Sequence, residues 1–198
     1  MRNATKPVRR VIAVITAALV VASAATPAHA STRSPRPPHG RWDHVVIVME
    51  ENHGYSEIIG NPDARYINRL ARRGALFTRS HALTHPSQPN YLALFSGSTH
   101  HIDNNTCPIT LHAANLGQQL RAAGYRFAGY SEGLPYAGDP VCEHNAYRRR
   151  HVPWAAFADL PGLVNRPLRR MPTNFRRLPT VSFVIPDLDD DMHDGTVA

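Results

Sequence analysis

The sequence lacks the short motifs that identify several large enzyme classes. It contains no glycine-rich nucleotide loop, no Gly-x-Ser-x-Gly motif and no His-Glu-x-x-His motif, so nothing local indicates a nucleotide-binding protein, an α/β-hydrolase elbow or a zinc-protease helix. It also has no internal repeat and no heptad pattern. With 198 residues, of which 42% are hydrophobic, the chain is long enough for one globular domain with a substantial core.

Acidic residues are absent from the N-terminal segment, whose composition changes in a regular order. Four basic residues precede an apolar stretch from Val11 to about Ala25, and residues 28–30, Ala-His-Ala, form a small-x-small cleavage site. This order is typical of a secretory signal peptide. An uncleaved anchor is the alternative, but the stretch is shorter than the roughly 20 residues that span a bilayer. We therefore expect residues 1–30 to be removed on export, leaving a secreted or cell-envelope protein without a stable membrane span.

Positive charge is concentrated at the same end of the chain. The formal net charge is +7, and without those four basic residues it is +3, which is too small to indicate a nucleic-acid partner. A Pro-, Arg- and Ser-rich linker at residues 31–41 precedes the single domain expected at residues 42–198. Cysteine is scarce, and in the oxidising compartment that export implies Cys107 and Cys142 are expected to form a disulfide; two buried thiols are the alternative.

Three apolar stretches end abruptly in polar residues. They are residues 45–49, followed by Glu50, Glu51 and Asn52; residues 75–83, followed by the polar segment 84–90; and residues 180–185, followed by the acidic segment 186–195. Runs rich in β-branched residues without polar alternation predict strands in a parallel sheet covered on both faces, the first of them an interior strand. Because the carboxyl ends of parallel strands share one edge of the sheet, we expect the polar residues to converge on one site.

Helices are predicted between these strands. Cap and periodicity signals indicate a helix from about Asn61 to Gly74, a short helix beginning near Ser87, and a helix from a Thr110 cap to Gly124, before a further strand at residues 125–130. Ser87 has two interpretations. Its hydroxyl either caps the helix or acts as a nucleophile at a helix N-terminus, where N–H groups and the helix dipole hold a phosphate.

Histidine is abundant, with twelve residues in the chain. Imidazole and carboxylate groups in strand-end loops are what a divalent metal site requires. Asp191, His193 and Asp194 lie within one such loop. A solvated acidic turn is the equally weighted alternative for this segment.

The three polar segments together resemble a known family. They read Val-Met-Glu-Glu-Asn-His-Gly-Tyr at residues 48–55, His-Pro-Ser-Gln-Pro-Asn-Tyr at residues 85–91 and Asp-Met-His-Asp-Gly at residues 191–195. In this order they are similar to the bacterial phosphoesterases that include phospholipases C and acid phosphatases, within the alkaline phosphatase-like superfamily. The resemblance implies an α/β fold with a mostly parallel central sheet and helices on both faces.

The resemblance also implies roles for individual residues. Ser87 matches the nucleophile, and Asn90 matches an amide that contacts the phosphoryl oxygens. His193 and His151 match residues that lie near the phosphate, and the match of His151 is the weaker of the two. The divalent metal ligands implied are Glu51, Asn52, Ser87, Asp191 and Asp194.

The implied activity is a secreted, metal-dependent phosphoesterase whose substrate is a small phosphate ester. The alternatives are a phospholipase C acting on phospholipid headgroups and a secreted anion-binding protein without turnover. Related proteins continue past the acidic segment with further ligands, so the resemblance also implies that the chain is the N-terminal portion of the domain. On that interpretation we expect the strand at residues 180–185 to lack a partner.

Overall fold

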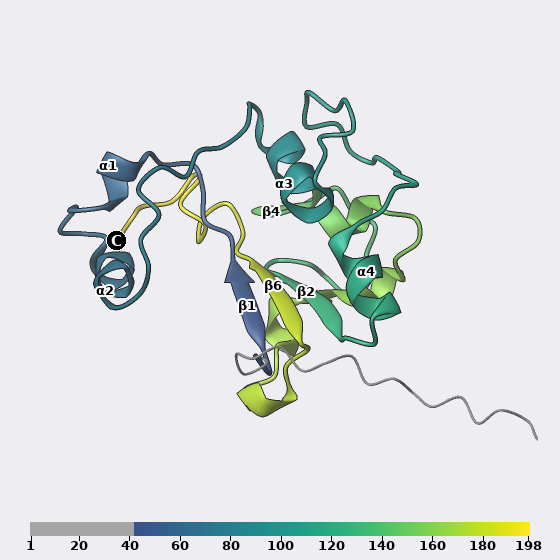
Figure 1. The fold of residues 1–198 in the computed structure, drawn as a ribbon. Helices are drawn as coiled ribbons and strands as arrows, with labels where there is room; N and C mark the ends of the chain where they lie inside the picture. Colours follow the sequence, from purple (N-terminus) through teal and green to yellow (C-terminus); the bar gives the residue numbers. More distant parts are fainter. Residues whose placement is uncertain (1–41) are drawn as a thin grey trace, which may run out of the picture. The chain divides into compact units, whose positions relative to one another are not determined.

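A computed structural model describes residues 42–198, so the predicted signal peptide and linker lie outside the described residues. The main sheet has four parallel strands in the order β1-β6-β2-β5 (Figure 1). The strands are β1 (Val45–Val48), β2 (Phe127–Ser131), β5 (Asn165–Pro167) and β6 (Val181–Ile185). The predicted α/β class with a mostly parallel central sheet is confirmed and is consistent with an alkaline phosphatase-like phosphoesterase.

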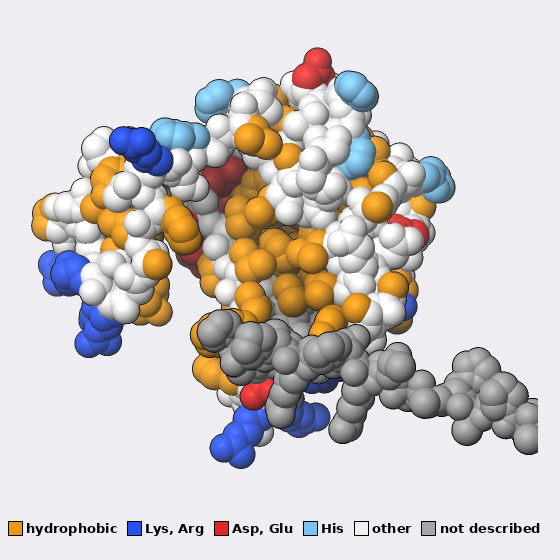
Figure 2. All heavy atoms as spheres, in the orientation of Figure 1, with side chains coloured by type: hydrophobic (Ala, Val, Ile, Leu, Met, Phe, Trp, Pro, Cys, Tyr) orange, Lys and Arg blue, Asp and Glu red, His pale blue; other side chains and the backbone are white. Residues whose placement is uncertain are grey.

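Strand β1 lies at the edge of the sheet, so the prediction of an interior strand is wrong. It pairs with β6 on one side, with Val45 opposite Val181, and within residues 42–198 no strand pairs with its other side. Val46 and Val48 remain 42% and 51% exposed, and Figure 2 shows hydrophobic side chains gathered on this face of the molecule. Strand β6, expected to lack a partner, instead lies between β1 and β2.

Residues 42–198 also form four α-helices and several short 3₁₀ turns. The helices are α1 (Tyr55–Ile58), α2 (Arg65–Arg73), α3 (Ser87–Ser96) and α4 (Leu116–Ala122). The turns are η1 (Arg149–His151), η2 (Pro153–Ala156), η3 (Gly162–Val164), η4 (Leu168–Arg170) and η5 (Phe175–Arg177), and a small hairpin pairs β3 (Glu143–His144) with β4 (Tyr147–Arg148). The predicted helix that ends at Gly74 is confirmed as α2.

An aromatic cluster fixes α3 on the sheet. Phe95 of α3 lies with its ring centroid 5.5 Å from that of Phe127 in β2 and 5.9 Å from that of Phe183 in β6. The indole of Trp154 packs so closely on β2 that a Cβ at Gly129 would overlap it. Because Phe95 and Ser87 belong to one rigid helix, this packing also positions the serine.

Two predicted elements differ from the structure, in each case because tertiary contacts occupy the backbone. Residues 75–83 form no strand, and the Asn90 side chain accepts hydrogen bonds from the N–H groups of Leu83 and Thr84. Helix α4 begins at Leu116 rather than after Thr110, since Leu111 pairs with the segment around Phe157 and Asn115 provides the cap instead.

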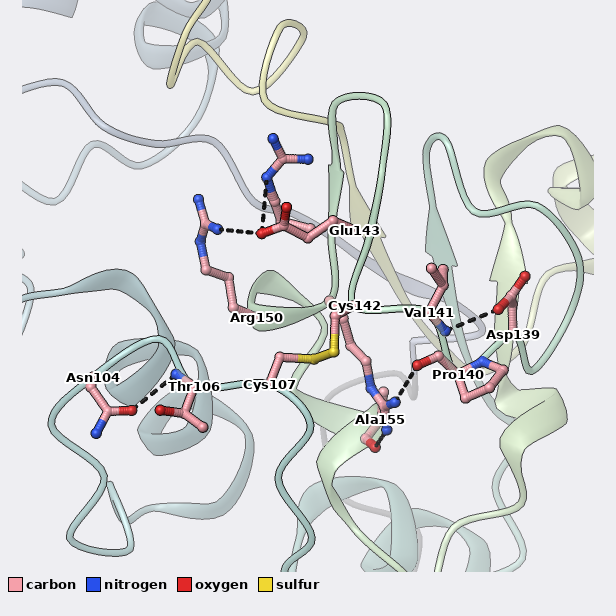
Figure 3. Close-up of a disulfide and its surroundings, with 12 residues drawn as sticks. Asn104, Thr106, Cys107, Asp139, Pro140, Val141, Cys142, Glu143, Arg150 and Ala155 are labelled. Atoms are coloured by element: carbon pink, nitrogen blue, oxygen red, sulfur yellow. Dashed lines mark hydrogen bonds and ion pairs between the residues drawn. A yellow bond between two sulfur atoms is a disulfide. The ribbon is translucent and has the colours of Figure 1, made fainter.

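The predicted disulfide between Cys107 and Cys142 is present (Figure 3). It joins the loop after α3 to the segment that carries η1, and Arg149 of η1 donates its N–H to the Cys142 carbonyl at 2.9 Å. Arg148 and Arg150, on the same segment, pair with Glu143. None of the helices described between residues 42 and 198 is long and apolar enough to cross a membrane.

Candidate functional site

Four polar side chains from four separate segments meet beyond the carboxyl ends of β1 and β6. Glu51 follows β1, Ser87 is the first residue of α3, His151 is the last residue of η1 and Asp191 lies in the loop after β6. The backbone N–H of Glu51 donates to the Asp191 carbonyl at 2.9 Å, which ties the two strand-end loops together. The expected convergence of polar strand ends therefore occurs for the first and last of the three segments, and α3 brings in the second.

Glu51 is the common neighbour in this group. Its Oε1 accepts a hydrogen bond from the Ser87 hydroxyl at 3.3 Å and lies 2.7 Å from Nε2 of His151. The Glu51 side chain is 16% exposed, so it reaches solvent on one side while contacting both partners. One carboxylate thus links the candidate nucleophile to the buried histidine.

His151 and Asp191 form the buried side of the group. Both side chains are 1% exposed, and Nδ1 of His151 lies 3.5 Å from Oδ2 of Asp191. The ring of Tyr91 stacks on that of His151 with centroids 4.9 Å apart. Nε2 of His151 and Oδ2 of Asp191 are both buried, and each lies close to an ionisable partner, Nε2 beside Glu51 and Oδ2 beside Nδ1 of His151, although neither contact has the geometry of a full hydrogen bond.

The charges in the group shift the pKa values of its members. Burial by itself would raise the pKa of Glu51, but His151 and Ser87 outweigh it and hold that pKa below its usual range. Burial likewise would lower the pKa of His151, but Asp191 and Glu51 outweigh it and raise that pKa. Next to them, burial and then the Asp191 carboxylate raise the pKa of Glu50 to about 7. Carboxylate and imidazolium therefore stabilise each other in the protein alone.

Ser87 is not the cap of its helix. Pro86 is the N-cap residue, and the Ser87 hydroxyl donates to Glu51 rather than accepting from the helix backbone. The Gln88 N–H in the same turn donates to Asn105. Ser87 therefore presents its hydroxyl at the positive end of α3, which removes the capping interpretation left open by the sequence.

Two predicted residues near Ser87 occupy different positions. Asn52 is exposed and lines a cleft together with Ser87. The Asn90 carboxamide is engaged with the neighbouring loop, since it accepts from Leu83 and Thr84 and donates to the carbonyls of Thr84 and Pro86. In the structure Asn90 therefore organises the rim of the cleft.

The remaining predicted residues lie beside Asp191. The His193 N–H donates to Oδ1 of Asp191 at 2.8 Å, and the His193 ring is 6.1 Å from that of His151 between centroids. Nδ1 of His193 contacts Asp194 at 2.7 Å, and the Asp194 side chain is 55% exposed. Asp194 is therefore largely exposed and contacts the neighbouring His193.

Comparison with known proteins identifies this chain's family. A model described as the Phosphoesterase family matches residues 61–198. The chain belongs to the phosphoesterase family. It is 51% identical over 158 residues to a phosphatidylinositol-3-phosphatase of Mycobacterium tuberculosis, a match that covers 78% of this chain and 53% of that protein.

More distant relatives of this phosphoesterase are fungal. It is 30% identical over 171 residues to a phosphate-repressible acid phosphatase of Penicillium chrysogenum, covering 79% of this chain and 40% of that protein. It is 30% identical over 169 residues to a probable acid phosphatase of Kluyveromyces lactis, a match that covers 76% of this chain and 39% of that protein. The chain therefore spans about half the length of its first curated relative, and less of the fungal proteins. No solved structure matches it significantly.

The residues present in this phosphoesterase fit a divalent metal ion. Glu51, His151 and Asp191 each place a ligand atom within 4.8 Å of the others. Mixed carboxylate and imidazole donors suit ions such as Zn²⁺ or Mn²⁺. Ser87, hydrogen-bonded to Glu51, adjoins these donors.

Sequence reasoning missed two features of this edge. Tyr91 was expected only as a helix residue, but it covers the buried face of His151. Glu132, Asp187 and Asp190 form a second group of carboxylates within 4.8 Å. Glu132 follows β2 directly, so the strand-end argument used for Glu51 could have found it.

A cleft of about 750 Å³ opens beside the Ser87 hydroxyl. Its polar lining includes Glu51, Asn52 and His53, and residues 80–86 and α3 also line it. This volume lies within the range of small-molecule binding sites. The cleft gives a substrate direct access to Ser87.

Proposed function

We propose that this chain carries the catalytic site of a metal-dependent phosphoesterase that acts through Ser87. The observation that carries the proposal is the convergence of Ser87, at the N-terminus of α3, with Glu51, His151 and Asp191. Membership of the phosphoesterase family supports the reaction class. The identity of the ion is left to experiment.

In this mechanism Ser87 attacks phosphorus from the cleft. A divalent ion held by Glu51, His151 and Asp191 would lower the pKa of the serine hydroxyl and offset negative charge on the phosphoryl group. Ser87 loses its hydroxyl proton to water in the cleft, and the Oγ–P bond forms as the P–O bond to the alcohol breaks. The positive end of α3 stabilises the phosphoryl oxygens. His193 is our candidate for the proton donor to the leaving alcohol. Water then cleaves the phosphoserine, which releases inorganic phosphate.

Ser87→Ala tests the nucleophile. We expect phosphate release from a chromogenic monoester to fall by at least about a thousandfold, while loss of the hydrogen bond to Glu51 lowers the free energy of unfolding by only about 0.5–1.5 kcal/mol. Ser96→Ala is the matched control, because Ser96 closes the same helix and its hydroxyl donates to the Leu92 carbonyl at 2.7 Å. A Ser87→Ala rate within tenfold of the parent would disprove the assignment.

Metal dependence and turnover are tested in the same assay. We expect a chelator to abolish phosphate release, and Mn²⁺, Zn²⁺, Mg²⁺ or Ca²⁺ to restore it to different extents. An anion-binding protein without turnover is the second candidate; it would bind phosphate but release none from the ester. Cleavage of a phosphodiester rather than a monoester would favour a phospholipase C.

The substrate is proposed to be a phosphate monoester. The name phosphatidylinositol-3-phosphatase of the Mycobacterium tuberculosis relative makes a phosphorylated lipid headgroup one substrate to include beside soluble esters. We further propose export through the N-terminal segment, which the disulfide supports because disulfides persist in oxidising compartments. Mass spectrometry of protein from the culture medium should find Ser31 as the first residue.

A further inference from the structure

Apolar side chains form part of the lining of the cleft beside Ser87. The apolar residues in its lining are Met49, Ala82, Leu83, Pro86, Ala93 and Leu94. Leu83 and Leu94 are 73% and 51% exposed, although single exposed leucines are ordinary on protein surfaces. Both leucines line the same cleft as the candidate nucleophile, and we call the six apolar residues the apolar wall.

Leu94 is aligned with Ser87 along α3. The two residues are seven positions apart, which is close to two helical turns, so their side chains lie on the same face about 10 Å apart along the axis. Asn90 and Tyr91, between them on the same face, also line the cleft. A ligand with its phosphorus at Ser87 and its ester group extended along α3 would reach Leu94.

Leu83 is held in place from the same helix. The Asn90 carboxamide accepts the Leu83 N–H at 2.8 Å and donates to the Thr84 and Pro86 carbonyls at 2.7 and 3.0 Å. These bonds fix the chain that carries Leu83 relative to the first turn of α3. The segment that carries Leu83 is therefore held against the first turn of α3, and Leu83 and Leu94 both line the cleft that contains Ser87.

We propose that this wall is a binding subsite for the apolar ester group of the substrate, so that the preferred substrates are phosphate monoesters of alkyl or aryl alcohols. The proposal deepens the function proposed above and rests on it for the position of the phosphoryl group. Burial of one methylene group favours binding about fourfold. An alkyl chain that is only partly covered by the subsite should therefore increase the binding affinity of its ester tenfold or more over the length of the chain.

Ethyl phosphate and octyl phosphate test the subsite, because their leaving alcohols differ in chain length but hardly in acidity. Calorimetry on the Ser87→Ala protein with Mn²⁺ measures binding without turnover, and phosphate release by the parent measures kcat/KM. Both are run below the concentration at which octyl phosphate aggregates. We expect octyl phosphate to bind at least tenfold more tightly than ethyl phosphate. We also expect kcat/KM for octyl phosphate to exceed that for ethyl phosphate more than tenfold.

Leu83→Gln and Leu94→Gln should each lower the octyl-to-ethyl ratio at least threefold, mainly through Kd and KM rather than kcat. Leu163→Gln is the matched control, since Leu163 is 68% exposed and lies outside the cleft lining; its ratio should equal that of the parent. Equal binding of the two esters, or a preference that appears only with aggregated octyl phosphate, overturns the subsite. A preserved binding ratio without phosphate release would instead overturn the proposed catalysis and keep the subsite.

Discussion

The disulfide allows a stability prediction whose size follows from the chain. Cys107 and Cys142 are separated by 35 residues, and a crosslink reduces the conformational entropy of the unfolded chain according to the length of the loop it closes. For a loop of this length the chain-entropy relation gives about 4 kcal/mol at 25 °C. Since a domain is stabilised by only about 5–15 kcal/mol in total, removing the crosslink should have a large effect.

The perturbation is the double variant Cys107→Ser with Cys142→Ser. We expect the free energy of unfolding in urea to fall by about 4 kcal/mol and the midpoint of thermal unfolding to fall by about 8–16 °C, as a domain of this size implies. The parent protein unfolded under reducing conditions is the control and should behave like the double variant.

The same variant also tests the connection between the disulfide and the site. The crosslink ends the segment that carries His151, but His151 is also held by the stacked Tyr91 ring and by Glu51 and Asp191, so Mn²⁺ binding should persist wherever the variant remains folded. A loss of stability below about 1 kcal/mol would refute the entropy argument. Such a result would mean that residues 107–142 are as constrained in the unfolded chain without the crosslink as they are with it.

Two further substitutions test the site and the core. Glu51→Gln should weaken Mn²⁺ binding by at least about tenfold. Glu50→Gln should change it far less, because Glu50 is not among the residues whose ligand atoms meet at this site; equal effects in calorimetry would contradict the ligand assignment. Gly129→Ala should lower the free energy of unfolding in urea by about 3 kcal/mol, because the added Cβ would overlap the Trp154 indole. The control Gly162→Ala should be nearly neutral, because its Cβ meets only ordinary contacts. A Gly129→Ala protein as stable as the parent would disprove the close packing.

Local features of the sequence determined several elements and part of the site. Helix α2 ends before Gly74 as predicted, although it begins at Arg65 rather than near Asn61, and strand β6 lies close to its predicted position. Glycine and apolar periodicity act over a few neighbouring residues and so can be read from the sequence. Ser87 was placed at the start of its helix for the same reason. The convergence of Glu51 with Asp191 also followed from the sequence, since parallel strands end at a common edge.

Tertiary contacts decided what local patterns leave open. The valine run of β1 specifies a strand but not its neighbours, so its place at the sheet edge depends on which strands the rest of the chain provides. Residues 75–83 have strand-forming composition, yet the Asn90 side chain bonds the backbone at their end. His151 comes from an irregular segment without periodicity, and its burial between Tyr91, Glu51 and Asp191 arises only when distant segments pack together.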